Sequence, residues 1–134
     1  MSKKLKNELV KGNRSLAEQI AIDLLRFHFK KLEVLPNDRK AVGRELDIYL
    51  PTLKVALEID GIFHTRPVFS EASFEKTKLN DAKKTKLCED ADIKLFRITL
   101  PEDSRKYYEF IKKDIVERIV PEIKLWVSLF PKEI

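Results

Sequence analysis

A chain of 134 residues is long enough to form one hydrophobic core and too short for two independent ones. Hydrophobic residues at 43% and charged residues at 37% are typical of a globular protein and exclude an intrinsically disordered chain. The formal net charge of +5 permits nucleic-acid binding without requiring it. No apolar run approaches the roughly 20 residues that span a bilayer, so we expect no membrane partner.

Two further features bear on the compartment. The basic N-terminus lacks the apolar stretch of a signal peptide. A single cysteine, Cys88, excludes an internal disulfide and fits a reducing environment. We therefore expect an intracellular, cytoplasmic protein.

The first 14 residues form a basic arm with a local excess of four positive charges. Its basic residues are Lys3, Lys4, Lys6, Lys11 and Arg14, against the single acidic residue Glu8. Such an arm can follow the phosphates of DNA, and Lys3, Lys4, Lys6 and Lys11 are our candidates for that contact. A solubilising tail has the same composition, so this alternative stays open.

A first helix is predicted to begin at Ser15, because Ser15 and Glu18 have the spacing of a capping box. We expect its buried stripe to consist of Leu16, Ile20, Leu24 and Phe27.

A β-hairpin is predicted next, with strands over residues 45–50 and 55–60 joined by a turn. A short strand over residues 31–36 and a loop over residues 37–43 precede it. Apolar residues alternate along both strands, so each strand should bury one face. These apolar residues are Leu46, Ile48 and Leu50 on the first strand and Val55, Leu57 and Ile59 on the second.

The remaining elements follow in the order loop, helix, strand and helix. We expect a loop over 61–74, a helix over 74–90, a strand over 93–100 and a helical region over about 104–130, kinked or broken at Pro121. The expected inward-facing residues are Leu79, Ala82 and Leu87 in the first of these helices and Phe110, Ile111, Ile115 and Ile119 in the second. This order predicts an α/β fold, a mixed central β-sheet flanked by α-helices, in one domain whose core spans about 15–100.

Three carboxylates gather on this hairpin. Asp47 should lie opposite Glu58 across the turn, and Asp60 shares a face with Glu58 at spacing i, i+2. Opposed like charges destabilise a sheet unless a cation or a proton compensates them. Mg²⁺ suits such a site, since one or two carboxylates, waters and phosphate oxygens hold it. The alternative is that these acidic residues form only the solvated face of the hairpin.

The hairpin reads RELDIYLP over residues 44–51 and VALEIDGIFH over residues 55–64. It resembles the core of the PD-(D/E)XK nuclease superfamily, and more narrowly the very-short-patch repair endonucleases and the phage homing endonucleases with a Glu-Asp-x-His-Asp pattern. The later segments NDAKK (80–84) and IKLFRI (93–98) are similar to the helix and strand that end the motif. The resemblance covers about residues 15–100 and implies a restriction-endonuclease-like core and a phage gene as one compatible source.

By this resemblance the catalytic positions are Glu18, Asp47, His64 and Asp81, with Glu58 beside them. Each has a structural alternative: Glu18 can serve the capping box, and Asp81 can form an ordinary helical salt bridge.

The chain departs from the superfamily at the customary Glu-x-Lys triplet, which reads Glu58-Ile59-Asp60. Mismatch-repair members carry a histidine near the position of Asp60. Because the customary lysine is missing, proton transfer falls to His64 or Lys84, or to a metal-bound water without their help.

The sequence thus predicts an Mg²⁺-dependent DNA endonuclease, with Mn²⁺ able to substitute, acting on double-stranded DNA. Asp47, Glu58 and Asp60 are the expected metal ligands, and Arg44 and Arg66 are further candidates for phosphate contact. The competing interpretations are a catalytically inactive nucleic-acid-binding module on the same fold and a structural or partner-binding α/β protein with an acidic hairpin face. The apolar segment 123–130 indicates a homodimer interface.

Overall fold

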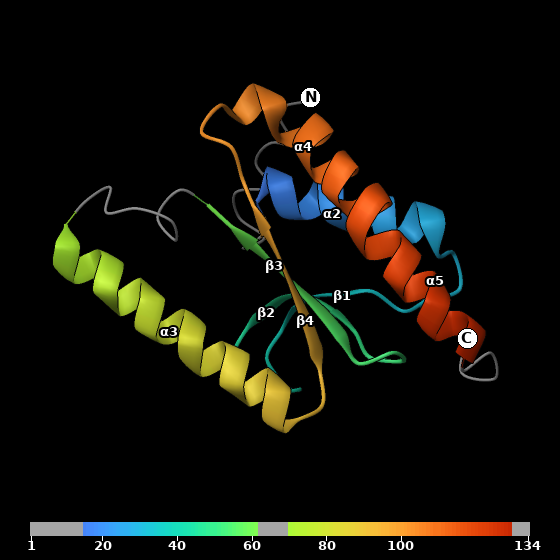
Figure 1. Cartoon of the computed structure of the whole chain (residues 1–134), viewed down its shortest axis with the longest axis horizontal. Coiled ribbons are helices and arrows are strands. Elements are labelled where there is room, and N and C mark those ends of the chain that lie inside the picture. Colours follow the sequence, from blue (N-terminus) through green and yellow to red (C-terminus); the bar gives the residue numbers. More distant parts are fainter. Residues whose placement is uncertain (1–14, 62–69, 130–134) are drawn as a thin grey trace.

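The computed structural model describes residues 15–61 and 70–129 and has the predicted mixed α/β architecture (Figure 1). Its helices and strands, in chain order, are α2 (Leu16–His28), β1 (Leu35–Asp38), β2 (Leu46–Leu50), β3 (Val55–Asp60), α3 (Glu71–Asp90), β4 (Lys94–Thr99), α4 (Tyr107–Asp114) and α5 (Val120–Leu129). A 3-10 turn over Ser104–Lys106 precedes α4, and a π-helical turn over Ile115–Ile119 joins α4 to α5.

The four strands form one sheet in the order β1-β2-β3-β4. β1 and β2 are antiparallel, β2 and β3 form the predicted antiparallel hairpin, and β3 and β4 are parallel. Leu50 pairs with Val55 and Ile48 with Leu57, so the predicted hairpin register is confirmed. β1 lies further along the chain than the expected strand over 31–36, and it includes Asn37, which falls in the expected loop.

Helix α2 begins as predicted, with the capping box between Ser15 and Glu18 complete in both directions. The expected buried stripe is wrong, because Leu16 is exposed and Phe27 is 71% exposed. The buried face is offset and consists of Ala17, Ala21, Ile22 and Leu25, together with the carboxylate-bearing Glu18. Ile20 and Leu24 pack only at the margin of the core. Hydrophobic periodicity marks the apolar residues of a helix but not the part of its surface that the sheet and the neighbouring helices cover.

The core lies on both faces of the sheet. The larger cluster joins β2, β3 and β4 to α2, α4 and the start of α5, and Figure 1 shows these three helices together on one side of the strands. The smaller cluster lies toward α3 and contains Leu46, Tyr49, Ala56, Cys88 and Ile93. Leu46 therefore packs in a different cluster from Ile48 and Leu50, contrary to the single apolar face we expected.

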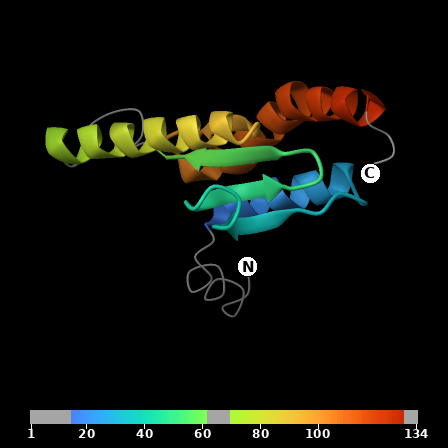
Figure 2. The same cartoon turned by 90° about the horizontal axis from the view of Figure 1, so that it is seen from below.

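Helix α3 begins at Ser70, its N-cap, earlier than predicted. Cys88 is its only buried residue, although the helix has 20 residues. Its N-terminal half projects beyond the sheet, as both views show (Figures 1 and 2). The expected burial of Leu79 and Ala82 is wrong. Leu79, in the projecting half, is 56% exposed, and Ala82 is exposed on the turn whose Asp81 and Thr85 contact Arg97, while Leu87 is half-buried.

The C-terminal helices bury Ile111, Ile115 and Ile119 as predicted, whereas Phe110 is exposed. The chain passes Pro121 without breaking, because the π-helical turn lies just before it. The Val120 N–H donates to the carbonyl oxygen of Ile115 in that turn. Pro121, the next residue, has no N–H to donate.

The apolar segment after Pro121 is divided between core and surface: Ile123 is buried, but Leu125 and Leu129 are 59% and 63% exposed. Across the two described ranges, no helix is both long and apolar enough to cross a membrane.

Candidate functional site

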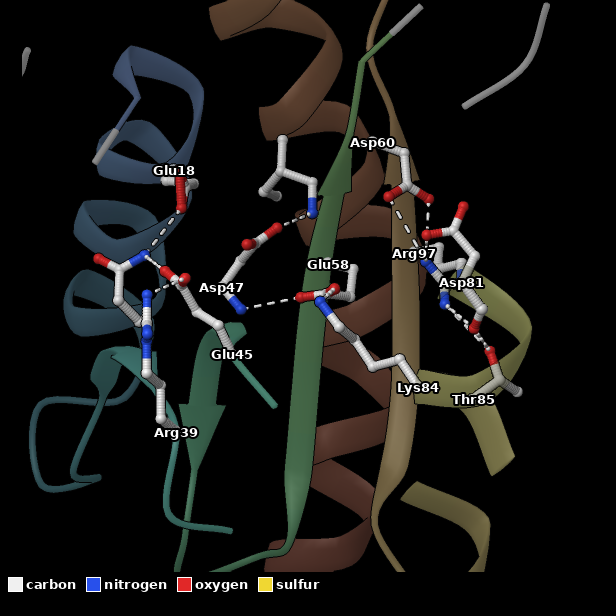
Figure 3. Close-up of polar contacts among 12 residues, drawn as sticks. Glu18, Arg39, Glu45, Asp47, Glu58, Asp60, Asp81, Lys84, Thr85 and Arg97 are labelled. Carbon is white, nitrogen blue, oxygen red and sulfur yellow. Dashed lines mark hydrogen bonds and ion pairs between the residues drawn. The ribbon is translucent and has the colours of Figure 1, made fainter. Parts of the chain in front are cut away.

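Asp47 and Glu58 lie where β2 and β3 separate. The regular ladder of the hairpin reaches Ile48 and Leu57. Beyond this pair, the acceptors of the backbone N–H groups are the two side-chain carboxylates and not carbonyl oxygens of the opposite strand. The Asp47 N–H donates to Glu58 Oε2 (2.8 Å), and the Ile59 N–H donates to Asp47 Oδ2 (2.8 Å). Figure 3 shows Asp47 between the two strands and the Glu58 carboxylate beside it at β3. The predicted opposition of Asp47 and Glu58 is therefore present, with both carboxylates held by backbone donors.

The Asp47–Glu58 pair is short of positive charge. Glu58 is only 4% exposed and Asp47 is half-buried. Burial, and after it the negative charge of Glu58, raises the pKa of Asp47 to about 8, although the hydrogen bond from Ile59 and the charge of Lys84 act in the opposite direction. At neutral pH the pair consequently retains a proton unless another cation arrives.

Lys84 reaches this pair from α3. Its ammonium group contacts Glu58 Oε1 in a hydrogen-bonded ion pair that is largely shielded from solvent. Glu58 thus bonds the backbone of Asp47 through one oxygen and Lys84 through the other. Lys84 therefore brings a cation to Glu58 from a separate element, 26 positions further along the chain.

A second polar group surrounds Arg97 of β4, which is the register partner of Glu58. Arg97 Nη1 lies 3.3 Å from Asp60 Oδ2 and 3.8 Å from Asp81 Oδ1. Arg97 Nη2 donates to the carbonyl oxygen of Asp81 (3.1 Å) and to Thr85 Oγ1 (3.0 Å). Asp60 and Asp81, predicted as a metal ligand and a catalytic residue, therefore share one guanidinium (Figure 3).

Glu18 of α2 lies on the side of Asp47 that faces away from Lys84 (Figure 3). Its Oε2 accepts the Ser15 N–H of the capping box (3.1 Å), and its Oε1 accepts a long hydrogen bond from Asn37 Nδ2 (3.4 Å). Asn37 also donates to Glu45 Oε1 (2.7 Å). The charge of Glu18 contributes to the raised pKa of Asp47, so its carboxylate serves the cap and acts on the site at once.

The predicted set of three metal-binding carboxylates is divided. Asp47 and Glu58 remain together, while Asp60, two residues beyond the register partner of Arg97, pairs with that guanidinium group. Within residues 15–61 and 70–129, no three His, Cys, Asp or Glu side chains converge as metal ligands. The expected gathering of Asp47, Glu58 and Asp60 around one ion is therefore not present as a preformed site.

The remaining candidates are Arg44 and six residues that the structure does not describe. Arg44 is exposed in the segment before β2. His64, Arg66, Lys3, Lys4, Lys6 and Lys11 lie outside the described residues.

Arg97 is the site residue that sequence reasoning missed. Its only signal is a cationic side chain on a strand that is otherwise largely apolar, and nothing in the sequence pairs that strand with residues 55–60.

Two carboxylates are still compatible with a divalent cation, since Mg²⁺ is commonly held by one or two carboxylates and retains several waters. The raised pKa of Asp47 is the electrostatic condition that such a cation relieves. Comparison with protein-family models, with curated proteins and with solved structures found no match.

Proposed function

We propose that the protein is a metal-dependent endonuclease that hydrolyses phosphodiester bonds in double-stranded DNA. The observation that carries this proposal is the Asp47–Glu58 pair, two adjacent carboxylates with too little positive charge between them and Lys84 at one side. The PD-(D/E)XK resemblance of the hairpin motif supports the same interpretation, including a restriction-endonuclease-like core.

Asp47 and Glu58 are the residues that would hold Mg²⁺ or Mn²⁺. When bound, the ion supplies charge neutralisation at the phosphodiester and a water that ionises near neutral pH. The chain's contribution to binding is preorganisation: backbone N–H groups of residues 47 and 59 hold the two carboxylates between the strands before any ligand arrives. Asp47 has to lose its proton to become a ligand, so cation binding should release a proton below about pH 8.

Lys84 supplies a cation in direct contact with Glu58. Its ammonium group is suited to stabilising the negative charge that develops on the phosphate in the transition state. It can also donate a proton to the leaving oxygen, a role that the sequence left open among His64, Lys84 and a metal-bound water. Glu18 acts through its charge and without direct contact: its negative charge favours the binding of a metal cation near Asp47 in addition to the ammonium group of Lys84.

We propose double-stranded DNA as the substrate, contacted at its phosphates by the basic arm and by Arg44, in a cytoplasmic protein. Leu125 and Leu129 are spaced i, i+4 on α5 and both exposed, which supports the homodimer expected from segment 123–130.

The test is cleavage of supercoiled plasmid with titrated Mg²⁺ and Mn²⁺, comparing the unmodified protein with Asp47→Asn. A matched control is Asp90→Asn, which removes an exposed carboxylate at the end of α3. We expect metal-dependent cleavage by the unmodified protein and the control and none by Asp47→Asn.

Two results would contradict the enzyme. Salt-sensitive DNA binding without cleavage by either metal would identify the inactive nucleic-acid-binding module instead. Equal cleavage by Asp47→Asn would remove the carboxylate pair from the mechanism.

A further inference from the structure

Helix α3 carries Lys84 to Glu58, but apolar packing does little to hold it there. Its only buried residue, Cys88, lies near its C-terminal end. On the N-terminal side of Lys84, Leu79 is exposed and the helix leaves the sheet (Figures 1 and 2). Most helices in proteins are stabilised by a packed apolar face. Something other than hydrophobic burial must therefore fix the position of α3 at the site.

The contacts of Arg97 supply that constraint. One guanidinium nitrogen donates to the carbonyl oxygen of Asp81 and to the Thr85 hydroxyl, at 3.1 Å and 3.0 Å. The other lies 3.3 Å and 3.4 Å from the two carboxylate oxygens of Asp60, at the end of β3. Because the guanidinium group is planar and rigid, these contacts fix both the distance and the rotation of α3 relative to β3.

The turn of α3 that Arg97 holds is the turn that bears Lys84. Residues 81 and 85 are one helical turn apart, and Lys84 lies between them on the adjoining part of the helix surface. On the sheet, Arg97 is the register partner of Glu58, the residue that Lys84 contacts. Rotating α3 by one residue, about 100°, would break the contacts of Arg97 and carry Lys84 away from Glu58 together.

The backbone of Arg97 is also held by a hydrogen bond from the C-terminal helical region. Arg118, in the π-helical turn, donates through Nη2 to the Arg97 carbonyl oxygen at 2.7 Å. The Arg97 side chain is only partly exposed, so its contacts with Asp60 and Thr85 are shielded from competing solvent.

We propose that Arg97 is a positioning residue of the nuclease site, which ties α3 to β3 so that Lys84 stands against Glu58. This inference rests on the proposed function for its catalytic consequence, but the positional statement does not. Arg97 acts through Lys84 and does not itself contact the substrate.

The kinetic test is a double-mutant cycle of Arg97→Gln and Lys84→Gln, with Arg105→Gln as the control because Arg105 pairs with nearby Asp103 on an exposed turn. We expect Arg97→Gln to lower kcat by roughly 10–100-fold, the usual effect of losing a supporting contact. KM should change little. The double variant should be no slower than Lys84→Gln by more than about twofold, because Arg97 has no further role once Lys84 is gone. Fully additive losses, or a fall in activity seen only in KM, would overturn the proposal.

A second test is independent of cleavage and separates this inference from the proposed function. Acetylation rates of individual lysines, measured by mass spectrometry, compare shielded Lys84 with exposed Lys83 on the same turn. We expect Lys84 to react more slowly than Lys83 in the unmodified protein and in Arg105→Gln, and at a similar rate in Arg97→Gln. An unchanged Lys84 rate in folded Arg97→Gln would refute the tie even if the enzyme cleaves DNA.

Thr85→Val keeps the test decisive if Arg97→Gln does not fold, since it removes one acceptor of the Arg97 contact and preserves the shape of the side chain. It should raise the Lys84 acetylation rate partway, and no rise would again contradict the proposal.

Discussion

Replacing Asp47 by asparagine should abolish cleavage and, in the metal-free protein, raise stability. The asparagine side chain matches the shape of the carboxyl group, and its oxygen can still accept the Ile59 N–H. It removes the negative charge that would bind a cation. It also removes the cost of keeping Asp47 protonated beside Glu58 when no cation is present.

The gain in stability follows from the pKa of Asp47, which rises from 3.8 to about 8 on folding. At pH 7 the folded protein holds a proton that the unfolded chain releases, and this difference opposes folding. Over the interval from 3.8 to pH 7, at about 1.4 kcal/mol per pH unit, it amounts to roughly 4 kcal/mol as an upper limit. The neutral amide of the Asp47→Asn variant escapes this cost. For a domain of this size, a gain on the order of 2 kcal/mol would raise Tm by roughly 5–10 °C.

The direction of the Asp47 pKa shift determines the pH range in which the stability of the variant should differ from that of the unmodified protein. A carboxyl group with a raised folded-state pKa does not affect stability below the unfolded value of 3.8, and it opposes folding increasingly as the pH rises to about 8. The Tm advantage of Asp47→Asn should therefore be absent near pH 4, grow through pH 6 and level off above pH 8.

The assay is thermal unfolding in a chelating buffer from pH 4 to pH 9, with Asp90→Asn as the control. Mg²⁺ should raise the Tm of the unmodified protein but not that of Asp47→Asn. A Tm for Asp47→Asn that equals or falls below that of the unmodified protein at every pH would refute the reasoning about the carboxylate pair.

Three further predictions concern the rest of the chain. His64→Ala should lower the cleavage rate by about 10²–10⁴-fold with little change in DNA affinity, and a normal single-turnover rate would leave proton transfer to Lys84 or to a metal-bound water. Deleting residues 1–11 should weaken DNA binding evenly across sequences and flatten its dependence on salt in a titration, whereas an unchanged slope would show that the arm stays off the DNA. Replacing both Leu125 and Leu129 by lysine should convert a dimer to a monomer in sedimentation, and a protein that is monomeric beforehand would contradict the interface.

The local features of this protein could be predicted from its sequence. The capping box at Ser15 and the hairpin register that opposes Asp47 and Glu58 both depend on residues a few positions apart. A short turn between two alternating strands leaves few registers that bury both apolar faces, so the carboxylate pair follows from spacing alone.

Which cation meets which carboxylate depends on the tertiary structure. Lys84 is 26 positions from Glu58, and Arg97 is 37 positions from Asp60. These pairs require the parallel register of β3 and β4 and the rotation of α3, neither of which leaves a periodic signal in the sequence. The same limit explains the errors in α2 and α3, where the apolar residues fit one helical face but the buried surface was set by what the sheet and the neighbouring helices could cover. The local sequence thus brings the carboxyl groups of Asp47 and Glu58 together. Long-range packing determines that Asp60 pairs with Arg97 and that Glu58 pairs with Lys84.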